Sequence, residues 1–534
     1  MSQIGKPPCD DALILCGAPA VPCARSKQRW VLTAAILGSS MAFVDGTVVN
    51  VALPAIQRDL NATAFDVQWV VESYALFLAA LLLVGGALGD RFGRRRIFGI
   101  GVALFALASV GCALSENVHE LIAARAVQGI GGALLVPGSL ALISASFPEQ
   151  ERGRAIGTWS GFSGITAAFG PVLGGFLVDR YSWAWAFLIN VPLALAVLAI
   201  AWRHVPESRS GAAGALDVGG ALFATMALGG IVYAFIEAPT RHWSSGAVRV
   251  ALLAGLAAAV AFVFWERRAR APMLPLHLFR NRNFAGANLL TLLLYAALGG
   301  GLYFFPLNLI QVQGYGATAA GAALLPFILI MFVLSRWAGT LVDRFGARLP
   351  LAVGPVIAAL GFVLFALPGD DASNYWVSFF PAVAVLGIGM TITVAPLTTT
   401  VMNSVGADLA GVASGVNNAV SRAAAVLAIG VFGLVLAWAF DAGLDRTLSA
   451  VAPLQEVTAF LQTQRGKLAG AEVPAGIDAA LAATLKQAVP RSYVSGFRWV
   501  MLLSAALALL SALAAWLSIE GKPGRASSTA AGKT

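Results

Sequence analysis

Runs of about 20 apolar residues recur along almost the whole of this 534-residue chain, and they limit what it can fold into. A bilayer core about 30 Å thick is crossed by about 20 residues of helix, so each run is long enough to span a membrane. The composition agrees, because 58% of the residues are hydrophobic and only 11% are charged. In soluble domains roughly a quarter are charged. The sequence therefore predicts an all-α integral membrane protein.

Fourteen candidate membrane helices result when the apolar runs are divided at charges, at Pro/Gly clusters and at polar connectors. They are expected near residues 30–54, 68–89, 97–115, 119–142, 154–178, 184–203, 215–236, 247–265, 284–310, 317–340, 349–368, 374–402, 409–440 and 494–518. The segment 441–492 is too polar to span. It is expected either to fold as a short amphipathic helical hairpin over the outer mouth or to be a tolerated insertion.

Basic residues collect in alternate connectors, for example at residues 94–96 and 267–270. Cytoplasmic loops of membrane proteins carry an excess of Lys and Arg, so these connectors are predicted to be cytoplasmic. An even number of spans then places both termini in the cytoplasm, in a protein of the inner membrane. The same loops account for the net charge of +9, and since they form no stripe on one folded face, nucleic-acid binding is not expected.

One charged sequence motif occurs twice, as GALGDRFGRRR from residue 86 and as GTLVDRFGARL from residue 339. Each copy lies in a predicted cytoplasmic loop between the second and third helix of a set of six. The repeat indicates a duplicated six-helix unit, an arrangement known from secondary transporters. The predicted divisions are an N-terminal tail 1–29, a first half 30–204, an inserted helix pair with linkers 205–283, a second half 284–518 containing the extracytoplasmic loop 441–492, and a C-terminal tail 519–534.

Charged side chains inside predicted spans point to function, because they are expensive in a bilayer. Asp45 lies near the middle of the first span, where a carboxyl group that binds and releases a proton would serve proton coupling or cation binding; a structural ion pair is the alternative. Arg125 in the fourth span needs an acceptor, and Asp45 and Glu72 lie at compatible depths. Glu72 is only about one turn from the outer face, so a solvated position at the rim is an alternative to coupling. Asn417 and Arg422 form the predicted polar site of the second half.

The fifth span contains Gly170, Pro171, Gly174 and Gly175 within a few residues. Glycines let membrane helices approach closely, and proline bends a helix by removing a backbone hydrogen bond. A bent helix that packs closely can seal one side of a transport path.

Motifs for enzymatic chemistry are missing from the sequence. It contains no HExxH, no GxxxxGK[ST] and no GxSxG, and its four His are scattered over loops and helix ends. We therefore expect no enzyme, no cofactor and no metal site. Energy for transport must come from an ion gradient, or the movement is passive.

Several of these stretches resemble motifs of the major facilitator superfamily, and in particular of its fourteen-span drug:proton antiporters. DGTVVNVALP (45–54) is similar to the first-span signature of that group, LIAARAVQGIGGA (121–133) to its fourth-span motif, and FGPVLGG (169–175) to the antiporter motif of exporters. WAWAFLINVP (183–192) and GVASGVNNAVSR (411–422) resemble further signatures. The match covers roughly residues 30–518.

The resemblance implies roles for individual residues. Asp45 would be the coupling acid and Arg125 the proton-relay arginine, whereas Glu72 is a further candidate for coupling from its position in the second span alone. The repeated loop would form a cytoplasmic gate of Gly86, Asp90, Arg91, Gly93, Arg94, Asp343 and Arg344. Within it, Asp90, Arg91 and Arg94 would form a charge network that holds one state of the gate. The chain departs from the family pattern at Thr166, at Ala184 and at the three alanines 423–425. The alanines follow Arg422 directly and put the second-half polar site in doubt.

The implied function is a proton-coupled antiporter that exports hydrophobic or cationic drugs or toxic small molecules by alternating access. A dedicated exporter of one endogenous metabolite or lipid-like product is the alternative within the same fold, and an importer or a membrane receptor is the alternative outside it. The expected partners are the substrate, protons and the lipid bilayer. The participation of a periplasmic adaptor protein is left open.

Overall fold

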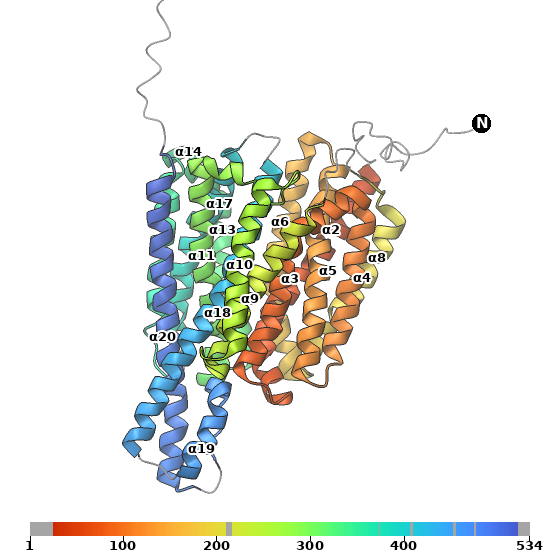
Figure 1. The fold of residues 1–534 in the computed structure, drawn as a ribbon. Helices are drawn as coiled ribbons and strands as arrows, with labels where there is room; N and C mark the ends of the chain where they lie inside the picture. The colour runs from red at the N-terminus through yellow and green to blue at the C-terminus, as the bar shows by residue number, and fades with distance from the viewer. Residues whose placement is uncertain are drawn as a thin grey trace, which may run out of the picture.

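The computed structural model describes residues 25–209, 216–372, 374–405, 410–451, 455–474 and 477–521. These residues are almost entirely helical and include no β-strand (Figure 1). The first six predicted spans correspond to α2 (Arg25–Asp59), α3 (Ala64–Phe92), α4 (Arg94–Ala113), α5 (Val118–Ser146), α6 (Glu149–Arg180), α7 (Trp185–Leu188) and α8 (Asn190–His204). The predicted inserted pair corresponds to α9 (Val218–Arg241) and α10 (Gly246–Arg268).

The remaining helices cover the last six predicted spans. They are η1 (Leu276–Arg280), α11 (Arg282–Leu307), η2 (Asn308–Val312), α12 (Ala317–Ala322), α13 (Leu325–Gly339), α14 (Leu341–Phe345), α15 (Arg348–Phe365), α16 (Tyr375–Ser378), α17 (Phe380–Asn403), α18 (Ala410–Val451), α19 (Gln455–Gln464), η4 (Arg465–Gly470) and α20 (Ala479–Ser518). η2 is a π-helical turn that continues α11.

Thirteen helices among the described residues are long and apolar enough to cross a membrane. The predicted fifth span, α6, is not among them, although its 32 residues exceed the length that a bilayer requires. Its sequence is rich in Gly, Ser and Thr, which lowers its hydropathy. The all-α membrane fold is confirmed, and the expected fourteen spans agree approximately with the thirteen found.

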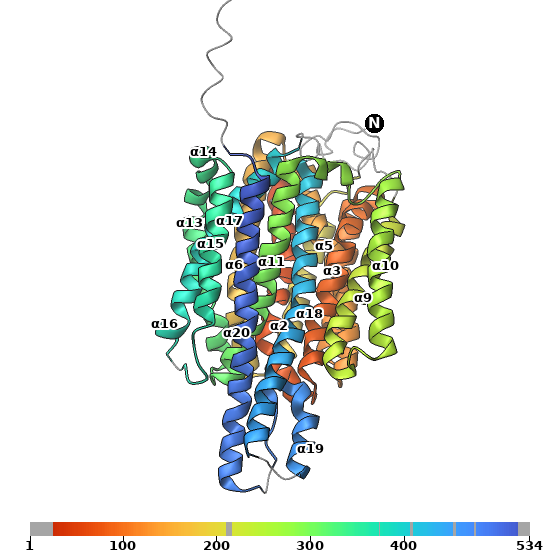
Figure 2. The same cartoon turned by 60° about the vertical axis from the view of Figure 1, so that its left-hand side comes forward.

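The helices gather in two groups (Figures 1 and 2). Helices α2 to α8 lie on one side and α11 to α20 on the other, while α9 and α10 pack together beside α3 and α18. Large apolar residues on α10 are exposed, with Val250 at 67% and Leu253 at 66%. Such an apolar face suits contact with lipid. The predicted domain boundaries themselves stay predictions.

Two helices are far longer than a bilayer requires. α18 has 42 residues and α20 has 40, and together with α19 they project beyond the ends of the other helices (Figures 1 and 2). We call this end of the molecule the α19 end and the opposite one the α14 end. The predicted loop 441–492 is therefore shorter than expected, because α18 continues to Val451 and α20 begins at Ala479. Between them lie α19 and η4, so helix accounts for most of the described part of this segment.

Glycines set the distance between neighbouring spans. A Cβ atom at Gly101 of α4 would lie 2.8 Å from the Leu134 Cβ of α5, and one at Gly361 of α15 would lie 2.8 Å from the Leu386 nitrogen of α17. Any side chain at these positions would force the helices apart. Close packing of this kind replaces the hydrophobic driving force that helices lose within a bilayer.

Candidate functional site

The two charges that the sequence places deepest in the first six spans form an ion pair. Asp45 lies near the middle of α2 and is fully buried, and Arg125 on α5 is 1% exposed. The Arg125 Nη1 donates a hydrogen bond to Asp45 Oδ2 over 2.5 Å. Of the two acceptors considered for Arg125, the structure therefore assigns Asp45.

Amide and hydroxyl groups surround this ion pair and complete what we call the Asp45 cluster: Asp45, Ser109, Arg125, Gln128 and Asn190. Gln128 Nε2 donates to Asp45 Oδ1 over 2.8 Å, and Asn190 Nδ2 donates to the same oxygen over 3.1 Å. Gln128 Nε2 also donates to Ser109 Oγ over 2.9 Å. The cluster thus joins α2, α4, α5 and α8 and supplies the hydrogen bonds that a buried carboxylate needs.

Aromatic rings cover the arginine. The Arg125 Cζ lies 4.2 Å from the centroid of the Tyr74 ring and 5.7 Å from that of Phe187, distances at which a cation is attracted to the ring face. The Arg125 Nε donates to the Val70 carbonyl oxygen over 3.0 Å. The guanidinium is therefore fixed in orientation by α3 as well as by the carboxylate.

Glu72 lies apart from the Asp45 cluster. It is fully buried on α3, and neither carboxyl oxygen has a hydrogen-bond partner among the described residues. The alternative of a solvated position at the rim is therefore wrong. Its electrostatic neighbour is Tyr303 of α11.

The predicted polar site of the second half is not one cluster. Asn417 of α18 donates to Asn288 Oδ1 over 3.1 Å and to Thr291 Oγ1 over 2.7 Å, both on α11. Arg422 follows five positions later, about 140° around the helix, and has no hydrogen bond or ion pair among the described residues. Its electrostatic neighbour is Tyr74, the residue whose ring also covers Arg125. Tyr74 therefore interacts with a charge of the first six spans and with a charge of the last six.

The first copy of the repeated loop forms part of the predicted charge network. Arg94 donates to Asp90 Oδ1, with its Nη2 at 2.7 Å, and both side chains are partly exposed. Arg91 is exposed and lies with its Cζ 5.4 Å from the centroid of the Phe92 ring, without an ion pair among the described residues. The expected network of three residues is thus reduced to one pair.

Glu207, which follows α8, is a residue of this region that the sequence motifs did not indicate. Its carboxylate accepts hydrogen bonds from the backbone nitrogens of Arg95 at 3.0 Å and Arg96 at 3.2 Å. Such a carboxylate at the first turn of a helix stabilises the free N–H groups there. Gly93 is required beside it, because its φ is +117° and a Cβ atom would lie 2.7 Å from the Glu207 Cδ.

The second copy repeats the backbone conformation of the first. Gly346 ends α14 with a φ of +76°, as Gly93 ends α3 with a positive φ. Arg344 is exposed, and the side chain of Asp343 lies outside the described part of the structure. Gly86 of the first copy is positioned at the α3–α5 contact, where a Cβ atom would lie 3.6 Å from the Pro137 Cβ.

The glycines of the predicted antiporter motif face two different helices. A Cβ atom at Gly170 would contact Thr47 of α2, and one at Gly174 would lie 2.7 Å from the Val48 Cγ1 of the same helix. A Cβ atom at Gly175 would collide with the Ala317 carbonyl oxygen of α12, and one at Gly321 of α12 would collide with the Pro171 carbonyl oxygen. We call this α6–α12 contact the seam. It joins the two groups of helices near the α19 end.

Asp179 extends the seam by one turn. Its carboxylate accepts hydrogen bonds from the Thr318 nitrogen at 2.9 Å, the Thr318 Oγ1 at 2.6 Å and the Ala317 nitrogen at 3.2 Å. Burial alone raises the pKa of Asp179, but the hydrogen bonds from Thr318 and Ala317 outweigh it and lower the pKa below its usual value. The group is therefore an acceptor at neutral pH.

A vestibule of about 910 Å³ opens at the α19 end between α2, α6, η2 and η4. Its charged lining residues are Arg58, Asp59, Asp179, Lys467 and Glu472. Among the described residues, no group of three or more His, Cys, Asp or Glu side chains could hold a metal ion.

Comparison with known proteins agrees with this architecture. A family model described as the Major Facilitator Superfamily matches residues 35–429. The multidrug resistance protein Stp of Mycobacterium tuberculosis (strain CDC 1551 / Oshkosh) is 36% identical over 427 residues, covering 80% of this chain and 79% of that protein. The tetracenomycin C resistance and export protein of Streptomyces glaucescens is 33% identical over 503 residues, covering 93% of each. The methylenomycin A resistance protein of Bacillus subtilis (strain 168) is 36% identical over 411 residues, covering 76% and 87%.

Among solved structures, a bacterial homologue of the human lysosomal transporter Spinster, in an inward-facing and unoccupied conformation, superposes with a TM-score of 0.63. The match covers 93% of this chain and 97% of that one at 18% identity, so it concerns the fold alone. Because a family model spans most of its length and relatives above 30% identity cover most of it as well, the chain belongs to the major facilitator superfamily and is a multi-pass membrane transporter, not an enzyme.

Proposed function

We propose that the protein is a proton-coupled antiporter that exports hydrophobic or cationic small molecules across the cytoplasmic membrane by alternating access. The observation that carries this proposal is the buried ion pair of Asp45 and Arg125, enclosed by amide donors within the first six spans. A carboxylate held in this way can exchange a proton only if its partners rearrange, and that requirement is what couples protonation to conformation.

Protonation of Asp45 would remove the negative charge that balances Arg125 and leave a buried guanidinium with neutral partners, among them Gln128, the Val70 carbonyl and the Tyr74 ring. Such a charge is costly, so the cluster would reorganise. Tyr74 is the residue through which the change would reach the last six spans, because its ring covers Arg125 and it interacts electrostatically with Arg422 of α18. Glu72 is the second acid available for coupling.

The α14 end and both termini are assigned to the cytoplasm because the basic connectors lie there. The α19 end then faces outward, with the seam, the Gln57–Gln311 hydrogen bond and the vestibule on that side. In alternating access the seam would part as contacts form near the repeated loops at the other end. A periplasmic adaptor protein, if one takes part, would meet the projecting α18, α19 and α20.

The names of two relatives favour a second candidate, the export of one endogenous product. The tetracenomycin C and methylenomycin A proteins are each named for a single compound, whereas Stp is named for multidrug resistance. Breadth of competition distinguishes the two candidates. Several unrelated dyes should compete for a multidrug exporter, and none should compete for a dedicated one.

The test is uptake of a cationic dye into everted vesicles, whose lumen corresponds to the outer side, with an imposed proton gradient that is acidic inside, with and without an uncoupler. Uphill movement that the uncoupler abolishes is the expected result. Uphill movement that is insensitive to the uncoupler, or purely downhill movement, would exclude proton antiport.

A further inference from the structure

Three buried side chains that carry a carboxyl or phenol group have no hydrogen-bond partner among the described residues, and all three lie near the α19 end. They are Glu72 of α3, Tyr303 of α11 and Tyr493 of α20, with exposures of 0%, 3% and 1%. A buried polar group without a hydrogen bond costs about 1–3 kcal/mol, and three of them close together call for an explanation. The Asp45 cluster does not include them.

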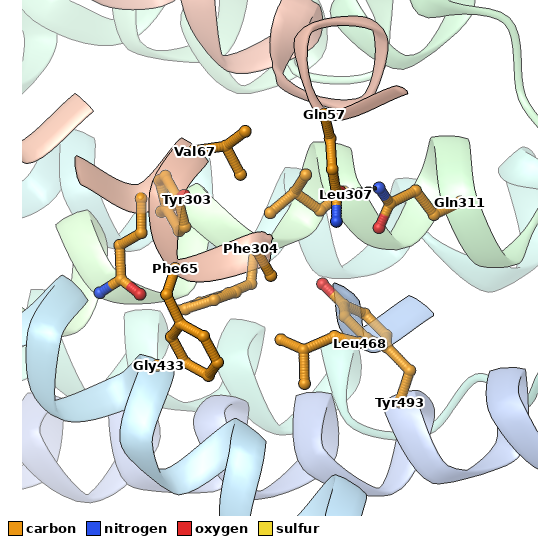
Figure 3. Close-up of a pocket in the computed structure, with 12 residues that line it drawn as sticks. Gln57, Phe65, Val67, Tyr303, Phe304, Leu307, Gln311, Gly433, Leu468 and Tyr493 are labelled. Carbon is orange, nitrogen blue, oxygen red and sulfur yellow. Dashed lines mark hydrogen bonds between the residues drawn. The ribbon is translucent and has the colours of Figure 1, made fainter. Parts of the chain in front are cut away.

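The two tyrosines line an enclosed cavity of about 20 Å³ between the two groups of helices (Figure 3). We call it the tyrosine pocket; its polar lining also includes Gln57, Gln68 and Gln311. The Tyr493 hydroxyl points into the pocket toward Gln57 and Gln311 (Figure 3). A cavity needs about 10–15 Å³ to hold a water molecule, and the water needs two to four polar partners. The volume and the lining meet both conditions for one water.

Glu72 lies beside this pocket. Tyr303 interacts electrostatically with both Glu72 and Tyr493, so the three side chains lie in the same region of the interface. On α3, Glu72 follows Gln68 by one helical turn, and Gln68 lines the pocket. A water in the tyrosine pocket would offer a hydrogen bond to the tyrosine hydroxyls that line it and are otherwise orphaned.

The tyrosine pocket and the vestibule share two lining residues. Gln57 and Gln311 line both spaces, and Gln311 Nε2 donates to Gln57 Oε1 over 2.8 Å. Gln57 Nε2 in turn donates to the Lys467 carbonyl oxygen of η4 over 3.1 Å. A route from the vestibule to Glu72 therefore crosses this amide pair and then the pocket.

We propose that the tyrosine pocket is a water site that connects the carboxyl group of Glu72 to the α19-side vestibule. The water receives a proton from one neighbour and passes another to the next, so no bond between heavy atoms forms or breaks. The amide pair closes this route until Gln57 and Gln311 separate. The claim that this route carries the protons of antiport rests on the proposed function. The water site itself does not depend on that function.

Infrared spectroscopy of the whole protein in detergent tests the proposal without substrate or gradient. The carboxyl band of Glu72 is identified as the one lost in Glu72→Gln, and its shift is followed after transfer into D₂O. We expect Tyr303→Phe and Tyr493→Phe to slow the exchange about tenfold, because each removes one hydrogen bond of the path while keeping the ring. Tyr233→Phe, on α9 and outside the pocket, should exchange like the parent.

Exchange at the parent rate in both pocket variants would overturn the water site, and so would the absence of any band lost in Glu72→Gln. Thermal unfolding of the purified variants establishes that a slower exchange does not reflect misfolding, since Phe retains the shape of Tyr. Dye efflux by the parent is measured separately. Failure of proton-driven efflux would refute the antiport and leave the water site standing, whereas unchanged exchange would refute the water site and leave the antiport standing.

Discussion

The Arg125 guanidinium and the Asp45 carboxylate meet at 2.5 Å in the interior of the first six spans, and no other arginine or lysine pairs with Asp45 among the described residues. Removing one partner of a buried pair leaves an uncompensated charge, which typically costs 3–5 kcal/mol. A structural role and a coupling role for this pair both predict a loss of activity after a single substitution. The two roles differ in whether a double substitution that removes both charges restores uphill transport.

Asp45→Asn should abolish uphill dye efflux, because the amide cannot exchange a proton, while substrate binding or downhill movement persists. The thermal midpoint should also fall, since Arg125 is left buried without its acceptor. Asp45→Asn combined with Arg125→Gln removes both charges and should recover the midpoint without recovering uphill efflux. If the double variant pumps dye uphill, the pair is structural and Glu72 becomes the principal coupling acid.

Gly175→Leu should weaken closure of the α19 end, because its side chain would occupy the position of the α12 backbone at Ala317. Over-packing of this kind typically costs 1–3 kcal/mol, and we expect it to reduce efflux or to make vesicles leak protons. Gly161→Leu is the matched control on α6, since a Cβ atom at Gly161 meets nothing within 4 Å. Equal efflux by both variants would show that the seam does not open and close during transport.

Asp90→Ala should lower transport while membrane insertion remains normal. The Asp90–Arg94 pair is partly exposed and contributes at most about 1 kcal/mol, so its loss changes the balance between conformations more than the stability of the fold. Arg91→Gln should retain more transport than Asp90→Ala, because Arg91 has no ion pair among the described residues. Transport measured per molecule inserted in the membrane checks both. Normal transport by Asp90→Ala would remove this residue from the gate.

Sequence reasoning located Asp45 and Arg125 because charges are rare within a bilayer, and a rare feature is informative. It passed over Gln128 and Asn190, although both lie within quoted motifs, because neutral amides occur in spans without a special role. Only the fold shows that α5 and α8 direct them at the same carboxylate. Glu207 was missed for a related reason. A single acidic residue in a basic connector does not indicate which helix end it caps.

The depth of Glu72 was misjudged for a different physical reason. Distance along a helix measures depth below the end of that helix, whereas burial depends on everything that packs over it. η4 contacts α3, whereas the sequence left open whether 441–492 covers the outer mouth or is only a tolerated insertion. Contacts between distant segments of this kind, such as Lys467 Nζ with Asn61 Oδ1 at 3.0 Å, are set by the tertiary fold.

Leu468 provides the sharpest test of that fold. It is 6% exposed within the tyrosine pocket, and its backbone has a φ of +50° and a ψ of −120°, a conformation that only glycine adopts without strain. Strain of this type costs about 1–3 kcal/mol, while burial of a leucine side chain contributes about 1.5–3 kcal/mol. Leu468→Ala loses the burial and keeps the strain, whereas Leu468→Gly loses the burial and relieves the strain. We therefore expect the alanine variant to unfold at a lower temperature than the glycine variant, the reverse of the usual order.

Both variants should make cysteines introduced along the vestibule more reactive, because η4 then holds the α19 end less firmly. A glycine variant less stable than the alanine variant would mean that Leu468 is not held in this conformation and that η4 does not anchor the two groups of helices together.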